Sequence, residues 1–381
     1  MTACLFGTYD RRHSANRLLA LALAGAGFPV EELHAPLWEE TRYKTHGYFA
    51  PTSLVRLGAR WLATARRLAQ AWRARSGPPP LVVVGFGGPL DVLLAHRVCR
   101  PRAALVFAPL VSVTETLVED RRVFPAGGVR ARAAVVLDRL TFRAADLVLA
   151  DTAAHADYLR ALGAPRVDVW PLGAEPEFAA PCDVTPMPRR VLFYGRYLPL
   201  HGIETIVRAA ALLGDQAEVV LIGGGPERPR IEALARAERA PITFRDEVPL
   251  ASMPAELAQA AVVLGVFDAG PKAAMVVPNK VWQAAAAGRP LVTRDGPALR
   301  EVLEPGRHCL VCPPADPAAL AAQVRTLLDD PALAARLGRA ARTHVLDAFS
   351  PARQAVRLAA VLETRLGIVA SAAAPRRAAD G

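Results

Sequence analysis

The sequence predicts an α/β fold in which two doubly wound, Rossmann-like domains face a central cleft. Short apolar runs typical of buried parallel strands alternate with helical patterns along the chain. The chain has 381 residues, whereas single hydrophobic cores stop growing at roughly 250–300 residues. A proline-rich stretch with no clear periodicity separates the two halves. Together these observations indicate two domains rather than one.

The first half is predicted to contain five strands. The first of them ends at Gly7, and Ser14 is a candidate N-cap for the helix that follows, which carries Leu18, Leu19 and Leu23. The five strands are the apolar runs Ala3–Gly7, Leu81–Gly85, Ala104–Phe107, Leu147–Ala150 and Val167–Trp170.

The second half is predicted to contain five more strands. Cys309 and Cys312 have C-x-x-C spacing, but their short apolar surroundings favour buried strand residues over a zinc or redox site. The odd, scattered set of cysteines is typical of reduced thiols. The five strands are Val191–Tyr194, Val219–Ile222, Ile242–Phe244, Val262–Val266 and Pro290–Val292.

These elements suggest boundaries for the domains. We expect one Rossmann-like domain over residues 1–173, a linker over 174–190 and a second Rossmann-like domain over 191–349. Residues 350–367 have a helical pattern and are expected to cross back onto the first domain. The tail 368–381, which is rich in Ala and Arg, is expected to be flexible.

The charge balance limits the partners. Lys and Arg number 46 and Asp and Glu number 36, which gives a net charge of +10 and favours anionic partners. Nucleic acid is disfavoured, because the basic residues are not interleaved with aromatic stacking platforms. No signal peptide and no apolar run of the roughly 18–20 residues needed to span a bilayer are recognisable. We therefore expect a cytoplasmic protein.

A basic amphipathic helix is predicted between Thr52 and Arg75. It could rest peripherally on anionic lipid at the inner membrane face, or it could be an ordinary surface helix whose apolar stripe packs on the sheet, which is the favoured interpretation. The segment lacks acidic residues and carries the arginines Arg56, Arg60, Arg66, Arg67, Arg73 and Arg75, interleaved with Leu54, Leu57, Trp61, Leu62, Leu68 and Trp72.

The most informative motif is the segment Val191–Ala211, VLFYGRYLPLHGIETIVRAAA, which predicts a strand, a basic loop and an amphipathic helix. Arg196 and His201 lie in the loop, and Gly195 and Gly202 lack a Cβ where the backbone would approach a ligand. Cations and the N–H groups of a helix N-terminus together make an anion site. An ordinary loop with solvated side chains remains the alternative.

Two further loops of the second half carry ligand-type residues. The run that includes Gly224 and Gly225 opens a helix near Glu227, which suits contact between phosphate oxygens and backbone N–H groups. Lys280 stands at a helix N-terminus, where the macrodipole disfavours a cation unless an anion binds. The same loop and helix also supply Lys272, Asn279 and Gln283, of which the last two can share a helix face with Lys280.

These motifs resemble the nucleotide-sugar domain of retaining GT-B glycosyltransferases of family four. The resemblance covers about residues 190–350 and rests on GR…HG, GGGP, PNKVWQAAAAGRPLV and DGPALREVLEPGRHCLVCPPADPAALA in that order. The first half shares the GT-B pattern more loosely, chiefly at Phe142–Thr152 and in VDVWPLGAE. The resemblance implies transfer of a sugar from a nucleotide-diphosphate sugar to an acceptor with retention of configuration, with the acceptor held by the first domain.

The resemblance also implies roles for particular residues. Arg196 and His201, the latter in place of a family lysine, would be the catalytic, diphosphate-holding pair. The two family glutamates of the E-x7-E pattern fall at Met275 and Gln283; Gln283 can still bond ribose hydroxyls, but Met275 cannot replace a carboxylate. The remaining diphosphate contacts would come from Gly195, Gly224, Gly225, Lys272, Asn279 and Lys280.

No D-x-D pattern ends a predicted strand, so we expect neither a metal nor a cofactor, and cations would assist departure of the diphosphate. A UDP-sugar is expected as donor in preference to a GDP-sugar, and a sugar, a lipid-linked molecule or another small molecule as acceptor. Asp10, His13 and Asn16 are candidates for acceptor contacts, or else form a capped loop. Two alternatives stay open: a non-catalytic nucleotide-sugar-binding partner protein, and an epimerase-like GT-B enzyme.

Overall fold

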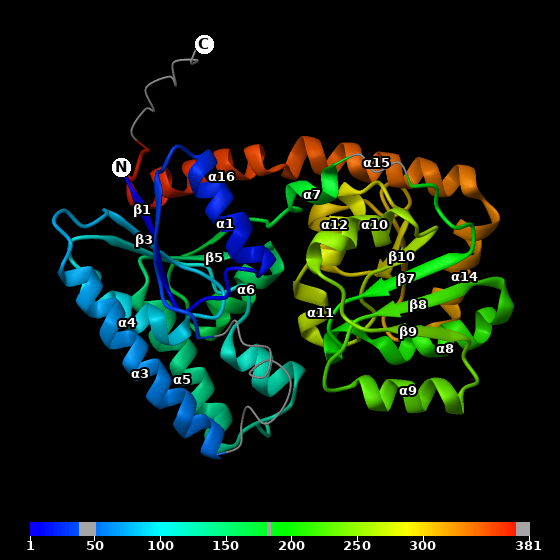
Figure 1. The fold of residues 1–381 in the computed structure, drawn as a ribbon, viewed down its shortest axis with the longest axis horizontal. Helices are drawn as coiled ribbons and strands as arrows, with labels where there is room; N and C mark the ends of the chain where they lie inside the picture. The colour runs from blue at the N-terminus through cyan, green and yellow to red at the C-terminus, as the bar shows by residue number, and fades with distance from the viewer. Residues whose placement is uncertain (38–50, 181–183, 371–381) are drawn as a thin grey trace, which may run out of the picture.

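A computed structural model describes residues 1–37, 51–180 and 184–370. The chain forms two α/β domains that lie side by side, and the last two long helices run along one side of both (Figure 1). Each domain has a six-stranded, wholly parallel sheet. The predicted fold class, two doubly wound Rossmann-like domains, is confirmed.

The N-terminal sheet has the order β2-β1-β3-β4-β5-β6. All five predicted strands are present, with bounds that differ by at most one residue, and β2 was missed. Because β2 is an edge strand, its residues Glu31 and Glu32 are exposed, and the segment has no continuous apolar run. The elements are β1 (Ala3–Gly7), α1 (Ser14–Gly25), β2 (Val30–His34), α3 (Pro51–Arg73), β3 (Leu81–Val84), α4 (Pro89–Cys99), β4 (Ala104–Phe107), the π-helix η1 (Glu115–Asp120), α5 (Val129–Ala144), β5 (Leu147–Ala150), α6 (Ala153–Leu162) and β6 (Val167–Val169).

The C-terminal sheet has the order β12-β11-β10-β7-β8-β9. Its predicted strands are present, and Cys312 lies in β12 with Cys309 buried just before it, as the apolar surroundings indicated. The elements are β7 (Arg190–Tyr194), η2 (Pro199–His201), α8 (Ile203–Leu213), η3 (Gly214–Gln216), β8 (Glu218–Ile222), α9 (Arg228–Ala237), β9 (Ile242–Arg245), η4 (Leu250–Ser252), α10 (Met253–Ala258), β10 (Val262–Leu264), α11 (Pro271–Met275), α12 (Asn279–Ala286), β11 (Leu291–Arg294), α13 (Pro297–Val302), β12 (Leu310–Cys312), α14 (Pro317–Asp329) and α15 (Pro331–Phe349).

The segments that join the domains are also ordered in part. The short helix α7 (Pro176–Ala179) lies between the sheets, and the helix α16 (Pro351–Leu366) packs along α1 of the N-terminal domain. The indole N–H of Trp170 donates to the carbonyl oxygen of Gln354 at 3.1 Å. Ile368, the first residue of the expected flexible tail, is only 9% exposed and packs in the same apolar cluster, whereas Val369 is exposed. Residues 371–381 and Cys182 lie outside the described residues.

Helix α3 packs as an ordinary surface helix along its apolar stripe. Leu68 and Trp72 are buried, and the Trp72 ring meets Phe6 edge-on at 6.4 Å between centroids. Exposed on the other side are Arg66 and Arg67, among others. The side chain of Leu54 lies outside the described residues. Within the described part of the chain, no helix has both the length and the apolar composition that a membrane span requires.

Candidate functional site

Three loops of the C-terminal domain meet where strand β7 lies between β10 and β8. Ligands of doubly wound sheets bind at such a topological switch point, beyond the carboxyl ends of the strands. Gly202 has a φ of +60°, and a Cβ there would lie 2.4 Å from the backbone nitrogen of Asp268. Gly202 is therefore required by the neighbouring loop after β10, which corrects our expectation that a ligand requires it.

Arg196 and His201 lie in the loop after β7, as predicted. The Nδ1 of His201 is hydrogen-bonded to the carbonyl oxygen of Arg196, so Nδ1 carries the proton. Burial, and then the nearby charge of Lys280, lower the pKa of His201 well below its usual range. His201 is thus neutral in the unliganded protein and supplies no charge there. The Arg196 guanidinium is half-buried, which lowers its pKa, and Glu247 opposes this effect.

Lys280 lies in the first turn of α12 and points into the same place. A Cβ on Gly195 would be 3.3 Å from its Nζ and 3.6 Å from the Cε1 of His201. The Nζ atom lies 3.8 Å from the centroid of the Phe193 ring, and among the described residues it has no hydrogen-bond partner. Lys280 is only 5% exposed, and this burial lowers its pKa well below the usual range. A buried cation without an anionic partner is costly.

The glycine run after β8 packs directly on this loop. The backbone N–H of Tyr197 donates to the carbonyl oxygen of Gly224 at 2.8 Å, and a Cβ on Gly225 would lie 2.8 Å from the Tyr197 nitrogen. Asn279, the first residue of α12, is half-buried. The structure therefore brings Gly195, Arg196, His201, Gly224, Gly225 and Lys280 together, with Asn279 beside Lys280.

Gln283 does not present a free amide. Its Oε1 accepts from the Tyr194 hydroxyl at 2.7 Å, and its Nε2 donates to Glu175 at 3.0 Å. All three residues are buried. Because both ends of the amide are used inside the protein, the geometry argues against the predicted contact with the donor ribose.

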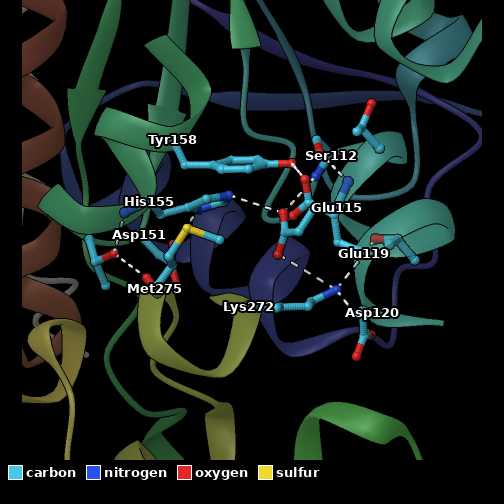
Figure 2. A network of polar contacts seen from close by, with 12 residues as sticks. Ser112, Glu115, Glu119, Asp120, Asp151, His155, Tyr158, Lys272 and Met275 are labelled. Carbon is cyan, nitrogen blue, oxygen red and sulfur yellow. Dashed lines mark hydrogen bonds and ion pairs between the residues drawn. The ribbon is translucent and has the colours of Figure 1, made fainter. Parts of the chain in front are cut away.

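Lys272, on α11, reaches toward Glu115 and Asp120 of the N-terminal domain (Figure 2). Its charge also contributes to the lowered pKa of His201. Its Nζ lies 3.6 Å from Oε1 of Glu115 and 3.5 Å from Oδ2 of Asp120, and it donates to the Thr116 hydroxyl at 3.4 Å. These three partners all belong to η1. The predicted diphosphate ligand thus forms ion pairs across the cleft instead.

Glu115 continues this network into the N-terminal domain. Its Oε2 lies 3.3 Å from Nε2 of His155, whose Nδ1 lies 2.8 Å from Asp151 (Figure 2). Burial alone would lower the pKa of His155, but Asp151 and Glu115 raise it to about 10. Burial alone would raise the pKa of Glu115, but His155 and Lys272 together lower it. His155 is therefore an imidazolium and Glu115 a carboxylate at neutral pH.

Two more contacts join the domains near this network. The Thr152 hydroxyl donates to the carbonyl oxygen of Met275. The carboxylate of Glu301 accepts from the backbone N–H groups of Ala153 and Ala154 at 2.6 and 2.9 Å, at the N-terminus of α6. A carboxylate there complements the helix dipole. Met275, where the family has a glutamate, thus takes part in the domain contact through its backbone.

The predicted acceptor residues follow β1 and are largely used in local structure. Asn16 donates to the carbonyl oxygens of Asp10 and Phe86 and accepts from the Phe86 N–H, so its amide ties two loops together. Asp10 accepts from the Arg12 N–H at 2.9 Å. His13, rather than Ser14, is the N-cap of α1 and accepts from Ala15 at 3.3 Å. This favours the capped-loop alternative and corrects the predicted N-cap.

Sequence reasoning missed the carboxylates and the imidazolium at the cleft. Asp151 and His155 are four residues apart at the start of a helix, a spacing that places them on one face. Glu115 gave no such signal, because its partners are distant in the sequence. Among the described residues, no three His, Cys, Asp or Glu side chains are grouped so as to hold a metal ion.

Parts of the sequence are similar to known glycosyltransferases. The model of the family "Glycosyl transferases group 1" matches residues 188–330. The chain is 31% identical over 151 residues to an alpha-D-kanosaminyltransferase of Streptomyces kanamyceticus, a match covering 39% of this chain and 38% of that protein. It is 27% identical over 319 residues to a 2-deoxystreptamine glucosyltransferase of the same organism, covering 78% and 80%.

Solved structures share the fold of the whole chain. A sucrose-phosphate synthase from Thermosynechococcus elongatus has a TM-score of 0.70 at 19% identity, over 95% of this chain and 98% of that one. HepE from Anabaena, solved with UDP-glucose, has a TM-score of 0.68 at 16% identity, over 96% and 100%. Residues 188–330 thus match the glycosyl transferases group 1 family, within a chain whose two domains together form a GT-B fold.

Proposed function

We propose that this protein is a glycosyltransferase that moves a sugar from a nucleotide-diphosphate sugar to an acceptor with retention of configuration. The observation that carries the proposal is Lys280, whose buried amino group has no hydrogen-bond partner in the described part of the chain and lies beside the loop of Arg196 and the glycine loops. Burial lowers the pKa of this amine well below its usual range, so it holds a proton best when an anion binds beside it. A diphosphate at the loop after β7 would supply that anion.

The chemistry follows from the charges at this loop. When the bond between the anomeric carbon and the diphosphate breaks, negative charge grows on the leaving oxygen. Preorganised cations stabilise that charge most where water is excluded. Arg196 can contact two phosphate oxygens at once, and Lys280 adds a point charge. His201, neutral in the empty site, would gain a proton only if the bound diphosphate raised its pKa. We propose that these groups act without a metal ion.

The donor and the acceptor are proposals that the relatives support. HepE was solved with UDP and with UDP-glucose, and both of these structures have the same overall fold as this chain. The kanosaminyltransferase and the 2-deoxystreptamine glucosyltransferase are named for sugar transfer in Streptomyces kanamyceticus. We therefore propose a UDP-sugar donor and a sugar-like small-molecule acceptor.

Calorimetry with UDP and GDP, each with and without magnesium, tests the donor site. Wild type should bind one of them independently of magnesium. Removing a charged partner of phosphate costs about 1.5–3 kcal/mol, so Arg196→Ala and Lys280→Met should bind roughly 10- to 100-fold more weakly. Arg208→Ala, an exposed change on α8, is the matched control and should bind normally. Absence of binding to any nucleotide by wild type would overturn the proposal.

A non-catalytic nucleotide-sugar-binding protein is the second candidate. Two residues favour this candidate, because they stand where the resemblance places the family's glutamates. The amide of Gln283 is hydrogen-bonded to Tyr194 and Glu175, and position 275 is a methionine. This candidate predicts donor binding without turnover. Release of UDP from UDP-sugars in the presence of a panel of sugar and aminocyclitol acceptors separates the two candidates.

We also propose peripheral contact with an anionic membrane through the exposed side of α3. The arginines that face solvent there carry the charge, because the apolar stripe of the helix is buried against the sheet. Arg66→Glu/Arg67→Glu should then reduce cosedimentation with phosphatidylglycerol vesicles. Arg208→Glu/Arg230→Glu, with the same charge change on the other domain, is the control. Equal binding by both double variants would contradict this contact.

A further inference from the structure

We infer that Lys272 is an interdomain positioning residue, whose charge holds α11 against the N-terminal domain, and not a ligand of the donor diphosphate. The inference rests on the proposed transferase function only where it concerns the donor. It replaces the role that the sequence suggested for this lysine. It also assigns a role to Glu115, Asp120 and His155, which the proposed chemistry does not use.

The direction of the Lys272 side chain is the first argument. Its three nearest oxygens, on Glu115, Thr116 and Asp120, all belong to η1 and lie 3.4–3.6 Å from Nζ. Figure 2 shows the side chain reaching from α11 toward these residues. Lys280, by contrast, faces Gly195 and His201. The two lysines of the candidate site therefore point to different partners.

The buried carboxylates of η1 also favour a position of Lys272 beside them. Glu115 is fully buried, and its Oε1 has no hydrogen-bond partner apart from its ion pair with Lys272. Asp120 is also buried, and burial raises its pKa despite the nearby Lys272. His155 already neutralises Asp151 and contacts the other oxygen of Glu115. Withdrawing Lys272 to a phosphate would leave two buried carboxylates short of a cation, which is costly.

The ion pairs of Lys272 affect the reaction because they hold α11 in place. The helix follows β10 directly and precedes α12, the helix that carries Lys280. Its other end is held by the bond from Thr152 to the Met275 carbonyl. Fixing α11 to η1 and α6 therefore fixes the donor loops relative to the acceptor side of the cleft. Such placement affects reaction rates strongly, since small misplacements of reacting groups are expensive.

The first experiment separates donor binding from positioning. Lys272→Met should bind UDP within about twofold of wild type, whereas Lys280→Met should bind it at least about tenfold more weakly. Turnover of Lys272→Met should fall by roughly tenfold or more, with an unchanged KM for the donor. Glu115→Gln/Asp120→Asn removes the charged partners and keeps the lysine. This variant should likewise bind UDP normally and have a reduced turnover. Lys272→Arg, which keeps the charge, should restore most of the turnover.

The second experiment needs no donor. Spin labels at Val129→Cys and Leu212→Cys, one exposed site on each domain, report the distance between domains in a Cys182→Ser background. The thiols of Cys4, Cys99, Cys309 and Cys312 are buried and should resist labelling. Lys272→Met should broaden the distance distribution or shift it to longer distances, and Lys272→Arg should not. Circular dichroism and thermal unfolding would confirm that each variant is folded.

Two results would overturn the inference. One is weaker UDP binding by Lys272→Met with normal binding by Glu115→Gln/Asp120→Asn, which would make Lys272 a phosphate ligand. The other is an unchanged distance distribution in every folded variant. If wild type bound no nucleotide, the proposed function would fail, and the distance measurement alone would decide the role of Lys272.

Discussion

The carboxyl ends of the two sheets meet at the cleft with opposite charges. The C-terminal domain brings Arg196 and Lys280 to its edge, beside glycine loops that leave the backbone accessible. The N-terminal domain brings carboxylates, among them Glu115, Asp120 and Asp151. The two edges have the same architecture, so topology supplies the place for a site, and the residues at the strand ends decide what it can hold.

The two edges also differ in how their charges are balanced. The carboxylates of the N-terminal domain have cations within the protein, namely His155 and Lys272. In the C-terminal domain, the Nζ of Lys280 has no hydrogen-bond partner among the residues that the structure describes. The charges of the N-terminal domain are therefore balanced by cations of the protein and are suited to holding the domains together. The unpaired amino group of Lys280 is why we propose that the donor binds at the C-terminal domain.

We expect the largest effect from substitution of Arg196, in the loop at the carboxyl end of β7. Removing one preorganised group that stabilises a leaving oxygen typically costs about 10²–10³ in turnover, so Arg196→Ala should lose most activity. Arg196→Lys keeps the charge and loses the bidentate contact, so its turnover should lie between that of Arg196→Ala and that of wild type. The measurement is UDP release with the active acceptor. Equal turnover of Arg196→Ala and wild type would remove Arg196 from the site.

Lys280→Met and Lys272→Met should change the stability of the protein in opposite directions, because within the described part of the chain only Lys272 has anionic partners. Because the methionine at position 280 replaces a buried amino group that has no hydrogen-bond partner among the described residues and whose pKa is lowered by burial, the variant should be more stable than wild type in the absence of nucleotide, by about 1–3 kcal/mol. The same change should abolish the stabilisation by UDP seen in a thermal shift. Lys272→Met is the control and should destabilise the protein, since Lys272 has anionic partners. A destabilised Lys280→Met would mean that the lysine is satisfied in the folded protein.

The balanced charges of the N-terminal domain should give a pH dependence of stability that comes from His155. Its folded pKa of about 10 lies above the usual 6.5, so its contribution is fully present below pH 6.5 and is lost as the pH rises toward 10. Between pH 7 and 9 the loss should be on the order of 2 kcal/mol relative to His155→Asn. Urea unfolding of both proteins across this range measures it. Parallel pH profiles would show that His155 is neutral.

His201→Lys should have the smallest effect. His201 is buried and neutral in the empty site, and the family has a lysine at this position, so the variant should retain activity. The pH profile of turnover should lose any limb due to the imidazole. Initial rates from pH 6 to 9 test this prediction. A loss as large as that of Arg196→Ala would show that the imidazole itself, through its bond to the Arg196 carbonyl, maintains the loop.

Local patterns drew attention to the loops at the carboxyl ends of the C-terminal strands. Arg196 and the glycine run that includes Gly224 and Gly225 lie within a few residues of strand ends, where an apolar run followed by a loop is visible in the sequence. Lys280 lies farther along the chain, in the first turn of α12, and was noticed as a cation at a helix start. The ion pairs of Lys272 were not predicted, because its partners on η1 are more than 150 residues away in the sequence. Gln283 was misjudged for a similar reason: its amide meets Glu175, a residue of the segment between the domains.

The sequence by itself determined the two parallel sheets, their strands apart from the edge strands β2 and β12, and the basic loop after β7. These features depend on short-range periodicity and on glycines and prolines at element ends, which act locally. Only the tertiary structure decided which charges are compensated. It paired Lys272 with Glu115 and left the Nζ of Lys280 without a hydrogen-bond partner among the described residues. The energy of a buried charge depends on neighbours brought from distant parts of the chain, and the order of residues alone does not contain that information.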